Sequence, residues 1–278
     1  TQQWRLNGAI TNADAQDRWM LTTPVSYPAD GTAMNTLRKS AANIRLGEYI
    51  ADATAESIAR YGLDTPRLVI RLHQAAGTIG TVGTTGSYAA TDYPEATITL
   101  VIGEQESDLV DYVLYDGGIY RCSTLLLRGV MNADWQETIT RYPVLTALGN
   151  LASLSRETAD GVDTWVITRT EQVAENNELV TDDEGNQVYD IALTKNGEPS
   201  DYTAFSAAYN QLMMVTMSGR LPDGWTAADA PHTVWTFTDV DGTVHTVALT
   251  RYDAMHDAVA IDGVALFYLI QGGFALGI

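Results

Sequence analysis

Four histidines are the side chains of this sequence best suited to bind a metal ion or to move a proton near neutral pH. They are His73, His232, His245 and His256. No two of them stand four residues apart, as on one face of a helix, and none lies among carboxylates at the spacing of a metal motif. We therefore predict four separate surface or core histidines, with no metal site, no cofactor site and no catalytic residue among them.

Cys122 is the only cysteine, so the chain can form neither an intramolecular disulfide nor a site built from several cysteines. It lies in the stretch Ile-Tyr-Arg-Cys-Ser-Thr-Leu-Leu-Leu, which is rich in apolar residues. Apolar surroundings favour the protonated thiol over the reactive thiolate. The sequence therefore predicts a buried, inert side chain at Cys122.

One short motif contains two closely spaced aspartates. Residues 234–244 read as an apolar strand followed by Asp239-Val-Asp241-Gly-Thr, which resembles the signature of haloacid-dehalogenase-like phosphatases. In that family the first aspartate is the nucleophile and the second is an acid/base. The resemblance would therefore assign those two roles to Asp239 and Asp241.

Three features of the sequence disfavour this phosphatase interpretation. Only 35 residues follow Thr243, whereas the family places a large domain downstream of the motif. The last lysine is Lys195, so no downstream lysine can hold a phosphate. Residues 244–250 alternate like a strand, where the family has a helix. A type I′ hairpin turn at Asp241-Gly242 accounts for the motif without catalysis.

The chain of 278 residues is strongly acidic, with 35 acidic and 16 basic residues and a net charge of −19. Such a surface repels the phosphates of nucleic acids and of anionic lipids, so nucleic-acid binding is not expected. Apolar residues make up 45% of the chain, enough for a packed core. The most apolar stretch, 266–278, is shorter than the roughly seventeen residues that a membrane span needs.

Asp-Gly and Asn-Gly pairs are the strongest local signal of structure, because they tolerate the positive φ angles of tight turns. These pairs begin at Asn7, Asp30, Asp116, Asp160, Asn196, Asp223, Asp241 and Asp262. Alternating apolar and polar runs enclose two of them, 151–157 with 164–170 and 234–238 with 244–250. Both places are predicted to be antiparallel hairpins.

Two amphipathic helices are predicted within this β background. Apolar residues recur near a period of 3.6 residues from about 32 to 50 and again from about 202 to 218. The apolar faces are Met34, Leu37, Ala41, Ile44 and Ile50 in the first helix, and Phe205, Tyr209, Leu212, Met213 and Met217 in the second. Asp201 or Ser200 would cap the start of the second helix, and Gly219 would cap its end.

The elements follow the same order in both halves, which predicts an α+β fold of two structurally similar repeats, each an antiparallel sheet with a packed amphipathic helix. In each half the helix precedes a strand that begins after Pro66 or Pro231. We predict the first repeat at 1–131, a connecting segment at 132–160 and the second repeat at 161–278. A Gly/Thr-rich insertion at 74–94 would be a mobile loop or a long hairpin.

Three segments of the first half carry a family resemblance. They are 57–72, with Tyr-Gly-Leu-Asp-Thr-Pro ahead of a strand, then 97–104, and then 112–121 with its Asp-Gly-Gly turn. In this order they resemble an uncharacterised bacterial domain-of-unknown-function family. Its members typically have an N-terminal membrane anchor and an extracytoplasmic repeat domain, and are often encoded beside gliding-motility-type ABC transporters. The resemblance supplies no catalytic residue.

These observations lead us to expect a non-enzymatic extracytoplasmic interaction or accessory protein, at the cell surface or in the periplasm. We expect it to be tethered by an N-terminal segment ahead of Thr1 and to have protein partners in a transporter or envelope complex. The alternative is a carbohydrate- or peptide-binding module with an aromatic cleft between the repeats. Many aromatic residues, such as Trp165, Tyr189 and Trp235, sit at alternating strand positions, where cross-strand packing is their ordinary role.

Overall fold

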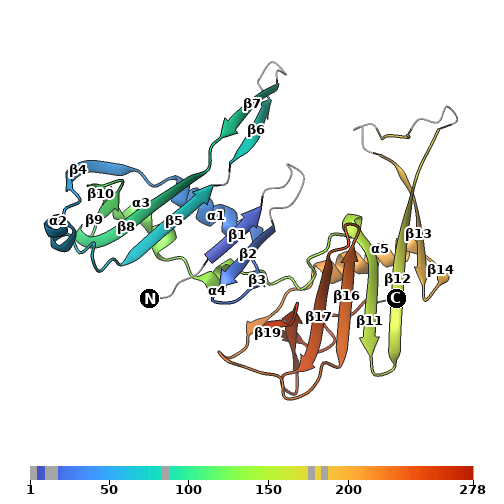
Figure 1. Cartoon of the computed structure of the whole chain (residues 1–278). Coiled ribbons are helices and arrows are strands. Elements are labelled where there is room, and N and C mark those ends of the chain that lie inside the picture. The colour runs from blue at the N-terminus through green and yellow to red at the C-terminus, as the bar shows by residue number, and fades with distance from the viewer. Residues whose placement is uncertain are drawn as a thin grey trace. The chain divides into compact units, whose positions relative to one another are not determined.

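The computed structural model describes residues 5–9, 18–74, 76–82, 88–174, 179–182 and 187–277. The chain forms two compact units (Figure 1): unit 1 consists of residues 1–30 and 139–278, and unit 2 of residues 31–138. Both units combine antiparallel sheets with a few short helices, so the predicted α+β class is confirmed, with sheet predominating. The repeat boundaries at 131 and 161, and the similarity of the repeats, stay predictions.

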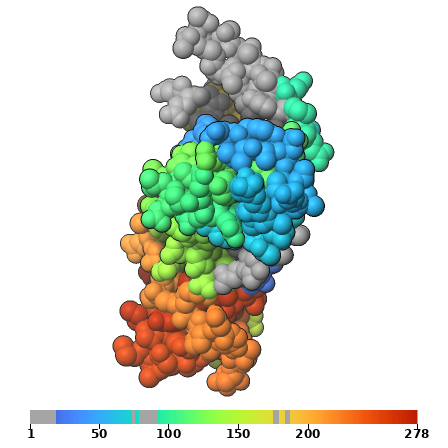
Figure 2. Space-filling model, turned by 90° about the vertical axis from the view of Figure 1, so that its left-hand side faces the viewer, coloured from blue at the N-terminus to red at the C-terminus, as the bar shows by residue number. Residues whose placement is uncertain are grey.

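Unit 2 is built on a five-stranded antiparallel sheet with the strand order β4-β10-β9-β8-β5. Its strands are β4 (Leu46–Asp52), β5 (Leu68–Gln74), β8 (Ala96–Ser107), β9 (Val110–Tyr115) and β10 (Gly118–Ser123). Strands β5, β8, β9 and β10 form a meander, and β4 pairs with the last of them. The space-filling view shows the blue and green segments of this unit side by side at its surface (Figure 2).

Helices α1 (Gly31–Ala42) and α3 (Thr124–Met131) pack on one face of this sheet. The buried cluster between helices and sheet consists of Ala41, Ile70, Leu100, Ile102, Val113, Cys122, Leu127 and Val130. Burying these apolar side chains stabilises the unit by roughly 1.5–3 kcal/mol for each large one. This cluster holds α3 against the sheet and thereby fixes the helix face that reaches the candidate site.

A short helix, α2 (Ala55–Arg60), leads into the first strand of the meander. Thr54 caps it in a capping box with Ser57, which satisfies two backbone N–H groups at the helix start. Gly62 ends the helix at φ +64°, a conformation that glycine adopts without strain. Pro66 then keeps the chain extended into β5. The strand predicted after Pro66 is confirmed as β5.

The Gly/Thr-rich insertion forms a hairpin of β6 (Gly77–Val82) and β7 (Tyr88–Tyr93). The sequence analysis left open a mobile loop or a long hairpin, and the described part of the insertion forms the hairpin. Residues 75 and 83–87 of the insertion lie outside the described residues.

Unit 1 contains a nine-stranded antiparallel sheet with the order β14-β13-β12-β11-β16-β17-β18-β19-β15, and a three-stranded sheet with the order β1-β2-β3. The strands of the large sheet are β11 (Leu151–Thr158), β12 (Gly161–Glu171), β13 (Tyr189–Lys195), β14 (Glu198–Ser200), β15 (Gly219–Arg220), β16 (Thr233–Asp239), β17 (Val244–Arg251), β18 (His256–Ile261) and β19 (Val264–Ile270). Those of the small sheet are β1 (Arg5–Ala9), β2 (Arg18–Thr23) and β3 (Tyr27–Pro28). The hairpins predicted around residues 160 and 241 are confirmed as β11–β12 and β16–β17.

Helix α5 (Tyr202–Met213) packs on one face of the large sheet through aromatic rings. Phe205 lies 6.3 Å from the ring of Trp165, and Tyr209 lies 6.3 Å from Phe237. The hydroxyl of Tyr209 donates a hydrogen bond of 2.9 Å to the carbonyl of Thr146, so its burial leaves no polar atom unsatisfied. The aromatic core sits between this helix and the sheet.

The predicted helix ends are wrong in both amphipathic helices. The first helix ends at Ala42 rather than near residue 50, and the chain continues as β4, while Ile44 packs on the core from beyond the helix. The second ends at Met213, with Asp201 as the predicted N-cap. Gly219 belongs to β15, where a Cβ atom would stand 2.3 Å from the hydroxyl oxygen of Tyr268. The prediction made both helices too long because apolar residues just past each helix continue the 3.6-residue spacing.

The Asp-Gly and Asn-Gly pairs divide into several types. Asp116, Asn196 and Asp262 have positive φ values, as does the glycine after each, and therefore form the predicted tight turns. At Asp241-Gly242 only the glycine has a positive φ, so this turn is not the predicted type I′. The pair at Asn7 lies inside β1 and is not a turn.

The segment between 132 and 150 contains two short helical pieces and an isolated β-bridge at Ile139. The helical pieces are α4 (Trp135–Thr138) and the 3₁₀ turn η1 (Leu148–Asn150). Within the described part of the chain, every helix is too short or too polar to span a membrane.

Candidate ligand-binding pocket

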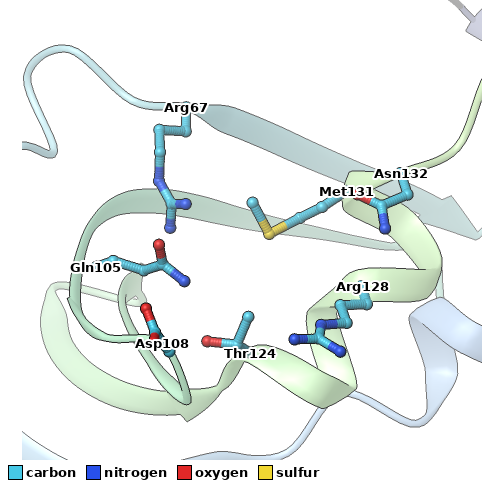
Figure 3. Close-up of a pocket in the computed structure, with 7 residues that line it drawn as sticks. All are labelled: Arg67, Gln105, Asp108, Thr124, Arg128, Met131 and Asn132. Atoms are coloured by element: carbon cyan, nitrogen blue, oxygen red, sulfur yellow. The ribbon is translucent and has the colours of Figure 1, made fainter.

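A polar pocket of about 420 Å³ opens in unit 2 between the start of β5, the β8–β9 connection and helix α3 (Figure 3). Its lining consists of Arg67, Gln105, Asp108, Thr124, Arg128, Met131 and Asn132. The volume falls in the range of roughly 300–1,000 Å³ that is common for small-ligand sites.

Arg67 enters the pocket from the residue that follows Pro66. Its backbone N–H donates to the carbonyl of Ile102, and its Nε donates to the carbonyl of Gly103 at 2.7 Å. Its Nη2 forms an ion pair with Oδ1 of Asp111, whose side chain is completely buried. These bonds fix the guanidinium group and leave Nη1 available, and the group points toward the cavity (Figure 3).

Helix α3 supplies the opposite side of the pocket. Thr124, Arg128 and Asn132 succeed one another at intervals of four residues, which places them along one helix face. Thr124 is 7% exposed, and its hydroxyl oxygen is buried without a hydrogen-bond partner among the described residues. Arg128 is exposed, and no hydrogen bond or ion pair joins it to another described side chain. The helix therefore presents donors that lack a protein acceptor.

The end of β8 contributes Gln105, and the β8–β9 turn contributes Asp108. The pairing of β8 with β9 is irregular on both sides of Gln105. A β-bulge of this kind changes the direction in which a strand side chain points, and bulges are common next to binding sites. Gln105 and Asp108 lie at one end of the pocket in Figure 3, away from Arg128 and Asn132.

The charges around the pocket are unevenly compensated. Asp111 neutralises Arg67, whereas Arg128 has no anionic partner among the described residues. In a chain of net charge −19, two guanidinium groups that line one pocket, one of them uncompensated, form a local positive feature. The pocket therefore suits a group that accepts hydrogen bonds and carries negative charge, with Asp108 as an acceptor at its other end.

Cys122 lies next to the aspartate that holds Arg67, because it pairs with Asp111 across β9 and β10. Its side chain is 2% exposed and its thiol is free, so the predicted buried cysteine is confirmed. Burial raises the pKa of the Cys122 thiol to about 11, and the Asp111 carboxylate adds to the rise.

We expect Cys122 to resist alkylation in the folded protein. At pH 8 a thiol of pKa 11 is ionised to only about one part in a thousand, whereas an ordinary thiol is substantially ionised. Iodoacetamide should therefore react at least about 100-fold more slowly with the native chain than with the urea-unfolded chain. Mass spectrometry of timed samples measures both rates, with free cysteine as the reagent control. Equal rates would contradict a buried thiol.

The four histidines lie apart, each beside a different carboxylate. The pairs are His73 with Glu95, His232 with Asp257, His245 with Asp262 and His256 with Asp253. Among the described residues, no three histidine, cysteine or carboxylate side chains are arranged to hold a metal ion.

Asp239 and Asp241 lie in the β16–β17 hairpin. Asp239 is 2% exposed, and the side chain of Asp241 accepts from the backbone N–H of Thr243 within the turn. The next element is strand β17, as predicted, rather than a helix. Asp239 and Asp241 therefore belong to a β-hairpin, and the motif does not form the strand–turn–helix arrangement of the phosphatase family.

The aromatic residues singled out from the sequence serve mainly the core. Trp165 and Trp235 are buried and stacked, with ring centroids 6.5 Å apart. Tyr189 is 42% exposed at the start of β13.

The sequence analysis missed the pocket. Arg67 and Asp111 are 44 residues apart, and only the pairing of β5 with β8 and β8 with β9 brings them together. One usable signal was Asp111 itself, an acid within the otherwise largely apolar strand β9. A buried acid implies a cation nearby.

The sheets and packed helices define an α+β protein with a polar pocket in unit 2. The chain belongs to the family described as domain of unknown function DUF4340, whose model matches residues 19–232. That match includes the whole of unit 2 and all residues that line the pocket. No curated protein and no solved structure matches the chain.

Proposed function

We propose that this chain is a non-enzymatic interaction protein that holds an acceptor group of its partner in the unit 2 pocket. The observation that carries the proposal is the convergence of Arg67, Arg128 and Asn132 around a cavity, with donors that lack protein acceptors. Hydrogen bonds from such unsatisfied donors to a ligand's acceptors make the free energy of binding more favourable. The arrangement suits binding and orientation of a ligand.

The place of action is part of the same proposal. The family resembled by residues 57–72, 97–104 and 112–121 has extracytoplasmic members with an N-terminal membrane anchor, often encoded beside ABC transporters. We propose that this chain is likewise tethered at the outer face of a membrane, as an accessory subunit of a transporter or envelope complex. A net charge of −19 favours a protein partner over an anionic lipid surface.

The order of the elements supports the further proposal that the two units contain diverged copies of one repeat. In unit 2, α1 is followed by β4 and the meander β5-β8-β9-β10, and β4 pairs with β10. In unit 1, α5 is followed by β15 and the meander β16-β17-β18-β19, and β15 pairs with β19. The copies would comprise residues 31–123 and 202–270.

Matching residues strengthen the case for duplication. The residue after each proline, Arg67 or His232, donates its backbone N–H to the second meander strand at 2.9 Å. Each of these residues also pairs with a buried aspartate, Asp111 or Asp257. Asp111-Tyr-Val-Leu-Tyr-Asp-Gly and Asp257-Ala-Val-Ala-Ile-Asp-Gly then run from that aspartate to the turn with the same spacing.

A photo-crosslinking amino acid at Asn132 tests the proposed function in the full-length protein within its native membranes. Asn132 lies at the pocket rim, whereas Glu157, exposed on β11 of unit 1, serves as the control position. We expect transporter or envelope subunits to be cross-linked from position 132 and not from position 157. Equal recovery from both positions, or none above background, would sink the proposal. Cross-links to a glycan would favour the carbohydrate-binding alternative.

A further inference from the structure

We infer that the pocket binds the free C-terminal carboxylate of a peptide segment. This inference rests on the proposed function, because it names the chemical class of ligand that the same site takes. The group must match three features of the pocket: its charge, the positions of its donors, and the acceptors at its far end.

The charge of the pocket favours a single negative charge on the ligand. Arg67 is already compensated by Asp111, so Arg128 is the guanidinium group whose charge remains free among the lining residues. Asp108 faces the same cavity and repels a second negative charge. A carboxylate fits this balance better than a phosphate dianion does.

The donors match the two oxygens of a carboxylate. A guanidinium group binds a carboxylate through two parallel hydrogen bonds, which an ammonium group cannot imitate. Arg128 has its donors unshared, and the amide of Asn132 lies beside it on the same helix face. We therefore place the carboxylate at the α3 side of the pocket.

The other end of the pocket offers acceptors. Gln105 and Asp108 lie opposite Arg128 and Asn132 in Figure 3. A peptide that ends in a carboxylate carries a backbone N–H on its last residue, and this N–H can donate to Asp108 or to the Gln105 carbonyl. Met131 adds an apolar surface for the last side chain. The carbon that bears a side-chain carboxylate carries no N–H.

A titration with four probes tests the inference on the full chain, followed by NMR signals of the Asn132 side chain and Arg128 Nε. The probes are N-acetyl-Ala-Ala with a free carboxylate, the same dipeptide as the C-terminal amide, N-acetyl-aspartyl amide, and inorganic phosphate. We expect saturable shifts with the free acid and at least tenfold weaker binding of the other three. Equal binding of the C-terminal amide, or tighter binding of phosphate, would overturn the inference that the ligand group is a carboxylate. Equal binding of N-acetyl-aspartyl amide would overturn the C-terminal assignment.

Two charge variants and a control complete the test. Arg128→Gln should weaken binding of the free acid about tenfold or more, because it removes the charged bidentate donor. Arg71→Gln makes the same charge change at an exposed position of β5 outside the pocket, and should alter binding less than twofold. Asp108→Asn should reduce the discrimination against phosphate about fivefold. Equal effects of the Arg128 and Arg71 substitutions would overturn the inference.

The two proposals fail separately. If position 132 cross-links a transporter subunit while the free acid does not bind, the ligand class is wrong and the proposed function stands. If the free acid binds while no partner is cross-linked, the ligand class stands and the proposed function is wrong.

Discussion

Trp235→Ala is expected to lower the free energy of unfolding by about 3–5 kcal/mol, the cost of removing a large buried aromatic side chain from a packed core. Trp235 is 1% exposed in the centre of the large sheet of unit 1. Its ring stacks at 6.5 Å on Trp165 and meets the ring of Phe274 edge-on at 5.7 Å. The guanidinium carbon of Arg156 lies 5.6 Å from its centre. Alanine would leave a cavity that these three neighbouring side chains cannot close.

Urea unfolding followed by circular dichroism measures this loss. Val166→Ala is the matched control, because Val166 follows Trp165 on β12 and is 41% exposed on the opposite face of the same sheet. The control should change the free energy of unfolding by about 0.5 kcal/mol or less. A cost for Trp235→Ala as small as that of Val166→Ala would contradict the aromatic core between α5 and the sheet.

The turns at Asp116, Asn196 and Asp262 could be predicted from the sequence because their chemistry is local. A positive φ at Asp116 or Asp262 depends on that residue and its glycine, not on distant contacts. Alternation along 151–157 and 244–250 is equally local, so the hairpins were predicted correctly. The helix ends were not, because Ile44 and Met217 are drawn into the core from outside the helices.

The pocket could not be predicted because none of its residues is conspicuous alone. In the sequence Arg128 is an ordinary polar position of an amphipathic helix, and Arg67 begins a strand. They face one cavity only because α3 packs over the sheet while irregular pairing at Gln105 reshapes the β8–β9 end. Tertiary packing of this kind leaves little trace in composition or periodicity.

Arg67→Ala should lower the free energy of unfolding by about 2–3 kcal/mol, because it leaves Asp111 buried without its cation. The side chain of Asp111 is completely buried, and its Oδ2 already lacks a hydrogen-bond partner among the described residues. A fully buried pair would cost about 3–5 kcal/mol to break, but Arg67 is 36% exposed and water can partly replace it. Urea unfolding again measures the loss.

The double variant Arg67→Met with Asp111→Leu separates stability from binding. It replaces the ion pair with apolar side chains, so we expect stability to return to within about 1 kcal/mol of the parent chain. Binding of N-acetyl-Ala-Ala should nevertheless stay weaker, since the pocket has lost the Nη1 donor of Arg67. Stability that did not return would show that the buried pair contributes more than charge compensation. Binding that returned with stability would remove Arg67 from the ligand site and leave Arg128 as its cation.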